Sequence, residues 1–170
     1  MRIALAKQRV QVEAPRELCF EVVASAGRVI ERISETERVV EFLTNYRGTS
    51  LRTVEKLVLE PPRRIRYSWL EGPLPAVEEE IAFLAEGSGE TEIVYSGEFT
   101  PQAGLPAWVY GRLLVKPRFE RIVREHLLEG KAIAEKRAAR SRRYPRSSDR
   151  VGPEGPTGGG GEHAWPTNTT

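Results

Sequence analysis

The chain has 170 residues, 39% of them hydrophobic and 29% charged, with a formal net charge of +2. This length supports one good core and favours a single domain, and the lone cysteine, Cys19, excludes a disulfide framework or a thiolate metal site within the chain. We expect Cys19 to pack as a small hydrophobic residue. The chain lacks an apolar run of about 18 residues and a signal-peptide core, which predicts a soluble, cytoplasmic protein.

The N-terminal segment predicts one strand and one short helix. Apolar and polar residues alternate from Ile3 to Glu13, which is typical of a strand with one solvated face. Pro15 favours the start of a helix, whose apolar stripe ends before Gly27. The segment from Arg28 to Thr36 has apolar residues at helical spacing and predicts a second short helix or a turn.

Five further strand-like segments follow at short, regular spacing, which indicates an antiparallel meander. They run from Arg38 to Tyr46, Leu51 to Leu59, Arg63 to Leu70, Pro75 to Ala85 and Thr91 to Thr100. Glycine and proline separate them. Gly87-Ser88-Gly89 lies between two strand-like segments and predicts the tip of a hairpin. It does not predict a phosphate loop, because no helix follows it. With the first strand, these segments predict a sheet of six strands or slightly more.

Alternation within the later strands predicts which side chains face inward. Tyr67, Trp69 and Tyr95 fall on the apolar faces of their strands. Glu79 falls on the apolar side between Val77 and Ile81, where a carboxylate is costly unless it is paired or protonated. The alternative is that Glu79 lies near a strand end and reaches solvent.

A long amphipathic helix is predicted from Pro117 to Arg140, after a short helix from about Pro106 to Val115 and a kink at Pro117. His126 and Gly130 interrupt its apolar stripe, which leaves room for a cavity. The alternatives are that His126 is a core histidine bonded to a backbone carbonyl, and that Gly130 admits a bulky side chain from a facing strand. We favour a direct pair or a water bridge between His126 and Glu79.

The residues from 143 to 170 are rich in Ser, Pro, Gly and Thr, and we expect them to form a disordered tail after a domain of residues 1 to 142. The excess of basic residues lies between Lys136 and Arg150. Cations at a helix C-terminus favour the helix dipole, so this cluster is first of all a good helix ending. A weak contact with anionic membrane is the alternative, and we expect no specific nucleic acid.

The predicted order of one strand, a short helix, a run of antiparallel strands and a long C-terminal helix resembles the helix-grip fold of the START-like superfamily. That superfamily includes polyketide cyclase/dehydrase-like (SRPBCC) proteins and plant pollen-allergen proteins. Three segments strengthen the resemblance: Val10 to Glu17 leading into a helix, and Glu60 to Ile65 and Gly89 to Tyr95 leading into strands. The resemblance implies an α+β fold in which the sheet wraps around the long helix and a hydrophobic ligand lies between them.

These patterns predict a protein that binds a hydrophobic small molecule, such as a lipid, an isoprenoid or a polyketide-like compound. The alternatives are a cyclase or dehydratase that uses His126 or Glu79 for proton transfer, and an interaction module without a ligand. We expect no cofactor and no metal. The predicted cavity is lined by Tyr46, Tyr67, Trp69, Glu79, Tyr95, Trp108 and His126.

Overall fold

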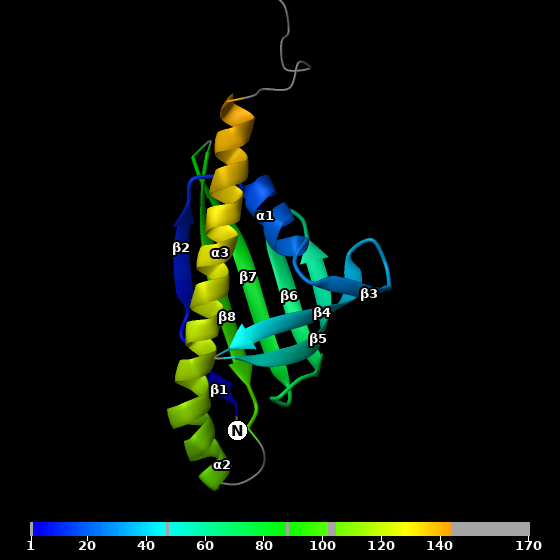
Figure 1. The fold of residues 1–170 in the computed structure, drawn as a ribbon, viewed down its shortest axis with the longest axis vertical. Helices are drawn as coiled ribbons and strands as arrows, with labels where there is room; N and C mark the ends of the chain where they lie inside the picture. The colour runs from blue at the N-terminus through cyan, green and yellow to red at the C-terminus, as the bar shows by residue number, and fades with distance from the viewer. Residues whose placement is uncertain (1, 47, 88, 102–104, 144–170) are drawn as a thin grey trace, which may run out of the picture.

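The structure is a computed structural model that describes residues 2–46, 48–87, 89–101 and 105–143, with the backbone alone described for Tyr46 and Leu105. One antiparallel sheet curves around a long C-terminal helix, and a short helix lies beside that helix (Figure 1). The elements are β1 (Ile3–Ala4), β2 (Gln8–Val12), α1 (Arg16–Ala24), β3 (Arg28–Arg32), β4 (Glu37–Tyr46), β5 (Thr49–Glu60), β6 (Arg64–Glu71), β7 (Val77–Glu86), β8 (Glu90–Phe99), α2 (Leu105–Tyr110), the π-helical η1 (Gly111–Val115) and α3 (Lys116–Arg143).

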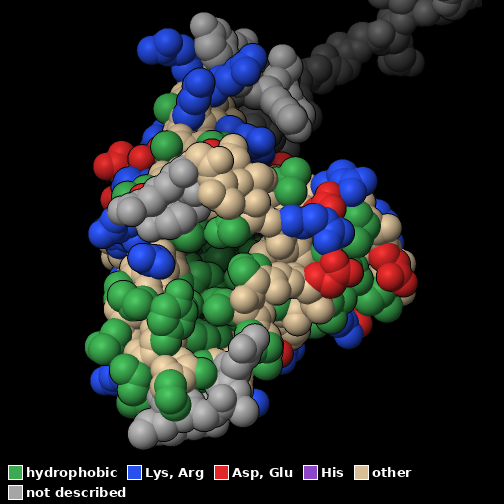
Figure 2. Space-filling view, turned by 60° about the horizontal axis from the view of Figure 1, so that its bottom comes forward, with side chains coloured by type: hydrophobic (Ala, Val, Ile, Leu, Met, Phe, Trp, Pro, Cys, Tyr) green, Lys and Arg blue, Asp and Glu red, His purple; other side chains and the backbone are tan. Residues whose placement is uncertain are grey.

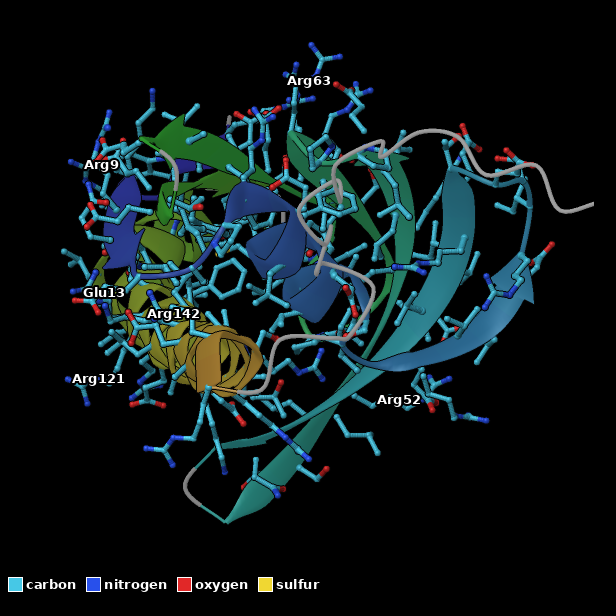
Figure 3. All side chains as sticks on the ribbon, turned by 90° about the horizontal axis from the view of Figure 1, so that it is seen from above. Arg9, Glu13, Arg52, Arg63, Arg121 and Arg142 are labelled. Carbon is cyan, nitrogen blue, oxygen red and sulfur yellow. The ribbon has the colours of Figure 1, made fainter. Side chains whose placement is uncertain are left out.

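The sheet is a meander of β3 to β8 to which the N-terminal strands β1 and β2 are added at one edge. Seven of its eight strands have the order β1-β8-β7-β6-β5-β4-β3. The eighth strand, β2, also pairs with β8, at a different part of that strand from β1. Seen from above, the strands curve around α1 and α3, and charged side chains such as those of Arg52 and Arg63 point away from the helices (Figure 3). The helix-grip architecture predicted from the sequence is therefore confirmed.

Two predicted segments differ from the structure. The first strand is two strands, β1 and β2, which pair with different parts of β8. The segment from Arg28 to Thr36 contains the edge strand β3, not a helix or a turn. Val29 and Ile30 are β-branched and remain 37% and 45% exposed, so a helix there would have had no apolar partner, whereas β4 offers a free row of backbone groups.

The sequence predicted a short helix, a kink at Pro117 and a long helix. In the structure α2, η1 and α3 follow one another without a break. The helical turn widens into η1 immediately before Pro117, with the Lys116 amide bonded to the Gly111 carbonyl. A proline has no amide proton and its ring crowds the carbonyl four residues earlier. The wider turn of the π-helix is a way to accommodate that crowding while the chain remains helical.

The edge strand β2 holds α3 in place through polar contacts. The Lys131 ammonium donates to the Gln11 carbonyl at 2.6 Å, and the Gln8 amide donates to the Glu120 carbonyl at 2.7 Å. The Glu13 backbone amide in turn donates to the Glu135 carboxylate at 3.0 Å. These bonds satisfy polar groups at the free edge of the sheet and fix α3 along β2. These polar contacts of α3 are thus made at the β2 edge of the sheet and not with its middle strands.

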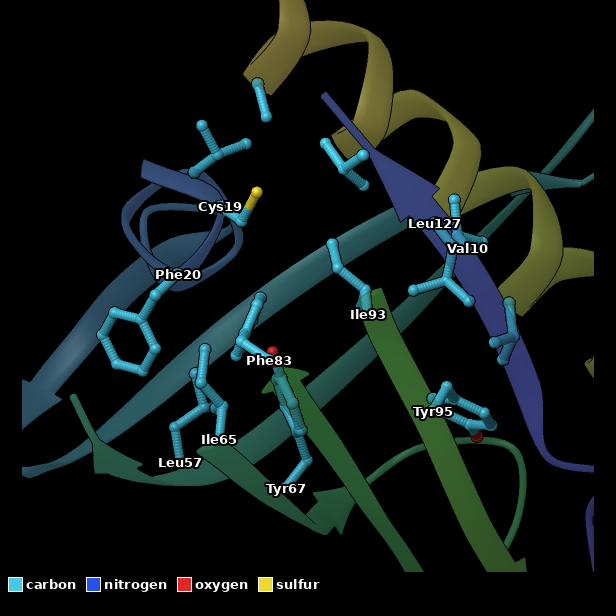
Figure 4. Close-up of a cluster of buried hydrophobic side chains, with 14 of the residues drawn as sticks. Val10, Cys19, Phe20, Leu57, Ile65, Tyr67, Phe83, Ile93, Tyr95 and Leu127 are labelled. Carbon is cyan, nitrogen blue, oxygen red and sulfur yellow. The ribbon is translucent and has the colours of Figure 1, made fainter. Parts of the chain in front are cut away.

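The hydrophobic core lies between β2, β6, β7, β8 and the two helices α1 and α3 (Figure 4). Phe20 of α1 packs edge-on against Phe83 of β7, with ring centroids 5.5 Å apart. Cys19 is 1% exposed, and burial raises the pKa of its thiol, so it packs as the small hydrophobic residue predicted from the sequence. The long helix contributes Phe119, Val123, Leu127, Ala134 and Ala138 to this core.

Candidate ligand-binding cavity

A cavity of about 750 Å³ lies between the inner face of the sheet, α1 and α3. The space-filling view shows a hollow in this region with apolar side chains inside it (Figure 2). The volume is within the range of known small-molecule sites, roughly 300 to 1,000 Å³. The sheet side is lined by Phe42, Thr44, Leu51, Thr53, Glu55, Tyr67, Trp69, Glu79, Ile81, Ile93 and Tyr95.

The apolar stripe of α3 serves the core and the cavity at the same time. Phe119, Val123 and Leu127 are buried in the core and also line the cavity, while Ile122 and Gly130 line it from the neighbouring turns. A side chain at Gly130 would first meet Val23 Cγ2, 4.0 Å from the added Cβ atom, so the space beside this glycine is open. The gap in the stripe is therefore part of the cavity.

Glu79 is a half-buried carboxyl group on the cavity wall, and both of its oxygens accept a hydrogen bond. Trp69 Nε1 donates to Oε2 at 2.8 Å, and the Tyr95 hydroxyl donates to Oε1 at 2.7 Å. Burial raises the pKa of Glu79, and the two donors oppose that rise by stabilising the charged form. Gly97 makes this arrangement possible, because a Cβ atom there would lie 2.8 Å from the Tyr95 hydroxyl.

Glu55 is a second carboxyl group on the same wall and is only 6% exposed. It lies opposite Trp69 in the β5–β6 register and accepts a hydrogen bond from the Thr53 hydroxyl at 2.6 Å. Burial, and after it the negative charge of Glu79, raise the pKa of Glu55 from 4.5 to about 8. Near neutral pH this carboxyl group is mostly protonated, and it is able to take or give a proton.

Two tyrosines complete the polar part of the wall. Burial and the charge of Glu79 raise the pKa of both Tyr67 and Tyr95, so both hydroxyls stay protonated at any physiological pH. Tyr95 donates to Glu79, whereas the Tyr67 hydroxyl makes no hydrogen bond to any residue that the structure describes. The wall therefore presents two carboxyl groups and one free hydroxyl to an otherwise apolar space.

Five of the seven residues predicted to line the cavity do line it. Tyr67, Trp69, Glu79 and Tyr95 lie together on its wall, and His126 lines it from α3. His126 is exposed, not buried as its place on the apolar stripe predicted, because the stripe is wider than the covered face. No described hydrogen bond or ion pair joins His126 to Glu79, whose two oxygens are occupied by Trp69 and Tyr95. The preferred His126–Glu79 pair is thus absent among the described contacts.

Trp108 and Tyr46 are the other two predicted residues. Trp108 packs against the core outside the cavity, its ring lies under the Arg112 guanidinium at 5.6 Å, and its Nε1 is buried without a partner among the described residues. Its position on the predicted wheel fails because the π-helical turn of η1 shifts the angle between α2 and α3. The side chain of Tyr46 lies outside the described residues.

Glu55 and Thr53 were not predicted from the sequence as site residues. The signal is nevertheless present, because Leu51, Thr53, Glu55, Leu57 and Leu59 alternate along one strand. The two leucines at the end of this series identify the inward face, so a carboxyl group two residues earlier lies on that face as well. Among the described residues, no group of three His, Cys, Asp or Glu side chains is placed to hold a metal ion.

An antiparallel sheet that wraps around one long C-terminal helix, with a cavity between them, defines a START-like helix-grip fold. No protein-family model and no curated protein sequence matches the chain. Solved structures do match it. A Thermus thermophilus protein, 21% identical, superimposes with a TM-score of 0.63 over 82% of this chain and 99% of that one.

Two further neighbours have descriptive names. The Zhui aromatase/cyclase from a Streptomyces species is 19% identical, with a TM-score of 0.56 over 88% of this chain and 99% of its own. A START superfamily protein from Mycobacterium smegmatis is 14% identical, with a TM-score of 0.57 over 81% of this chain and 99% of its own. At these identities the neighbours establish the fold alone. Within the described residues, no helix has the length and apolar character needed to cross a membrane.

Proposed function

We propose that this protein binds a hydrophobic small molecule, such as a lipid, an isoprenoid or a polyketide-like compound, between α3 and the sheet. The observation that carries this proposal is the cavity of about 750 Å³ with its largely apolar wall. A ligand that buries on the order of 300 Å² of apolar surface there gains roughly 7 kcal/mol before the entropic cost of binding. The aromatase/cyclase among the structural neighbours is the reason to include polyketide-like compounds.

Binding of a neutral fluorescent probe, N-phenyl-1-naphthylamine, tests this proposal. The full chain should enhance the fluorescence of the probe with saturation at one site. Gly130→Leu should weaken binding at least tenfold, because the new side chain enters the cavity, whereas Ala132→Leu, at an exposed position of the same helix, should not. Equal affinity in both variants would show that the probe binds elsewhere. Native mass spectrometry of the purified protein should show a lipid-sized adduct.

A second candidate function is proton transfer on the bound molecule, as in a cyclase or dehydratase. Glu55 favours it, because a carboxyl group with a pKa of about 8 is suited to general acid–base chemistry near neutral pH. Glu55→Gln would then abolish turnover of the compound found in the adduct and leave its affinity within about threefold of the original. If the adduct is returned chemically unchanged by the original protein, the binding function stands alone.

A further inference from the structure

We infer that the ligand of this cavity carries one basic nitrogen, held by the glutamate pair of Glu55 and Glu79 on an otherwise apolar wall. This inference rests on the proposed binding function and adds the chemical class of the ligand. It follows from three observations on the wall: how Glu79 is bonded, which cations are near, and which buried polar groups lack a partner.

Glu79 is held in the wall by two hydrogen-bond donors. Both of its oxygens accept hydrogen bonds, from Trp69 Nε1 and from the Tyr95 hydroxyl. Two donors that converge on one carboxyl group favour its charged form, whereas burial is the larger cause and raises the pKa of Glu79. When this carboxyl group ionises, its charge requires a counter-ion.

The chain itself does not supply that counter-ion among the described residues. No described Lys or Arg makes an ion pair with Glu55 or Glu79. Arg118 is the one Lys or Arg among the described lining residues, and it is exposed on α3. The partly buried Arg38 guanidinium opposes the rise in the pKa of Tyr67, but it donates to the Ala24 carbonyl at the end of α1. Neither glutamate is therefore paired with a described Lys or Arg.

Two buried polar groups on the wall also lack a partner. Glu55 is 6% exposed, and its Oε2 accepts no hydrogen bond from a described residue, whereas Oε1 is bonded to Thr53. Tyr67 is 8% exposed and its hydroxyl has no described partner. Both residues line the cavity. Neither atom is sealed from the cavity, so each is open to a hydrogen bond with a polar group of a ligand or with water.

The two carboxyl groups suit a cation better than an anion or a neutral group. Burial, and after it the negative charge of Glu79, raise the pKa of Glu55 to about 8, and burial raises the pKa of Glu79 as well. A basic amine is protonated at neutral pH and would favour the charged form of either carboxyl group. The other ionisable groups on the lining are Tyr67 and Tyr95, which stay neutral, the exposed Tyr110 of α2, and the exposed Arg118, His126 and Glu129 on α3. A protonated amine would pair with the carboxyl group that is charged and donate to Glu55 and Glu79. A fatty acid would add a third carboxyl group, and an alcohol would bring no positive charge.

Three ligands with the same dodecyl chain test the inference: dodecylamine, 1-dodecanol and dodecanoic acid. Each should be titrated at pH 7 against the full chain loaded with N-phenyl-1-naphthylamine. We expect the amine to displace the probe at a concentration at least tenfold lower than the alcohol, and the acid to require more than the alcohol. Glu79→Gln should abolish most of the preference for the amine and leave the affinity for the alcohol within twofold, whereas Glu31→Gln, on the exposed strand β3, should change neither.

The outcomes separate this inference from the function on which it rests. If the alcohol displaces the probe as well as the amine does, the cavity binds apolar ligands and the basic nitrogen is wrong. If the probe itself does not bind, the binding function fails and this inference fails with it. The comparison of the three ligands uses the unmodified protein, so it decides the question even if Glu79→Gln does not fold.

Discussion

At the residue scale, Glu55 makes the stability of the fold depend on pH. Its pKa is about 8 in the folded protein and near its ordinary value of 4.5 in the unfolded chain. Between these two values the folded state keeps a proton that the unfolded state releases. The free energy of unfolding therefore falls as the pH rises through this window, by at most about 1.4 kcal/mol per pH unit for one proton.

Replacement of Glu55 by Gln should remove most of this dependence. The amide keeps the size of the side chain and does not titrate, so the variant should lose less stability than the original protein between pH 5 and pH 8. Urea denaturation at several pH values measures the difference. Glu79, whose pKa is also raised, leaves a residual slope of the same sign. Glu31→Gln is the matched control, and an unchanged slope in Glu55→Gln would contradict the assignment.

Tyr95 determines whether Glu79 is satisfied. Tyr95→Phe removes the 2.7 Å hydrogen bond to Glu79 Oε1 and leaves that oxygen facing an apolar ring. We expect a loss of about 1 to 3 kcal/mol in the free energy of unfolding at neutral pH. Chemical denaturation measures it, with Tyr110→Phe as the control because Tyr110 is 55% exposed. A loss below that of the control would mean that the bond contributes nothing.

At the scale of the element, α3 divides its apolar stripe between packing and open space. Gly130 is the position where this division is most direct, since an added Cβ atom meets only Val23 Cγ2 at 4.0 Å. Gly130→Ala should therefore stabilise the protein by up to about 1 kcal/mol, because alanine favours a helix over glycine and nothing clashes. Thermal melting monitored by circular dichroism tests it. A decrease in melting temperature would show that the glycine is a close-packing contact.

At the scale of the whole molecule, α3 is the cover of the sheet. It supplies Phe119, Val123, Leu127, Ala134 and Ala138 to the core, and its last turn ends in Arg140, Arg142 and Arg143. A chain that ends at residue 143 should therefore keep a cooperative melting transition close to that of the full chain. A chain that ends at residue 115 should lose it, because the inner face of the sheet would be open to water. A cooperative melt in the shorter chain would contradict the role given to α3.

Prediction from sequence succeeded where one periodic pattern decided the structure. The alternation in β4 to β8 and the stripe of α3 are long and strong, so these elements were predicted to within a few residues. The segment from Arg28 to Thr36 is short, and its apolar residues fit either period. It became the strand β3 because the free edge of β4 was available for pairing. Trp108 was misplaced because one π-helical turn changes the helical phase, which the wheel did not include.

The sequence by itself determined the fold class, the inward side of β6, β7 and β8 and the presence of Glu79 on an apolar face. Only the tertiary structure decided which polar groups meet. Trp69, Glu79 and Tyr95 come from three strands, and whether their atoms lie within hydrogen-bonding distance depends on register and on the space left by Gly97. The same holds for the cavity, whose volume depends on α3 being fastened along β2 rather than over the middle of the sheet. Periodicity records which side of an element is covered, but not how far away its cover lies.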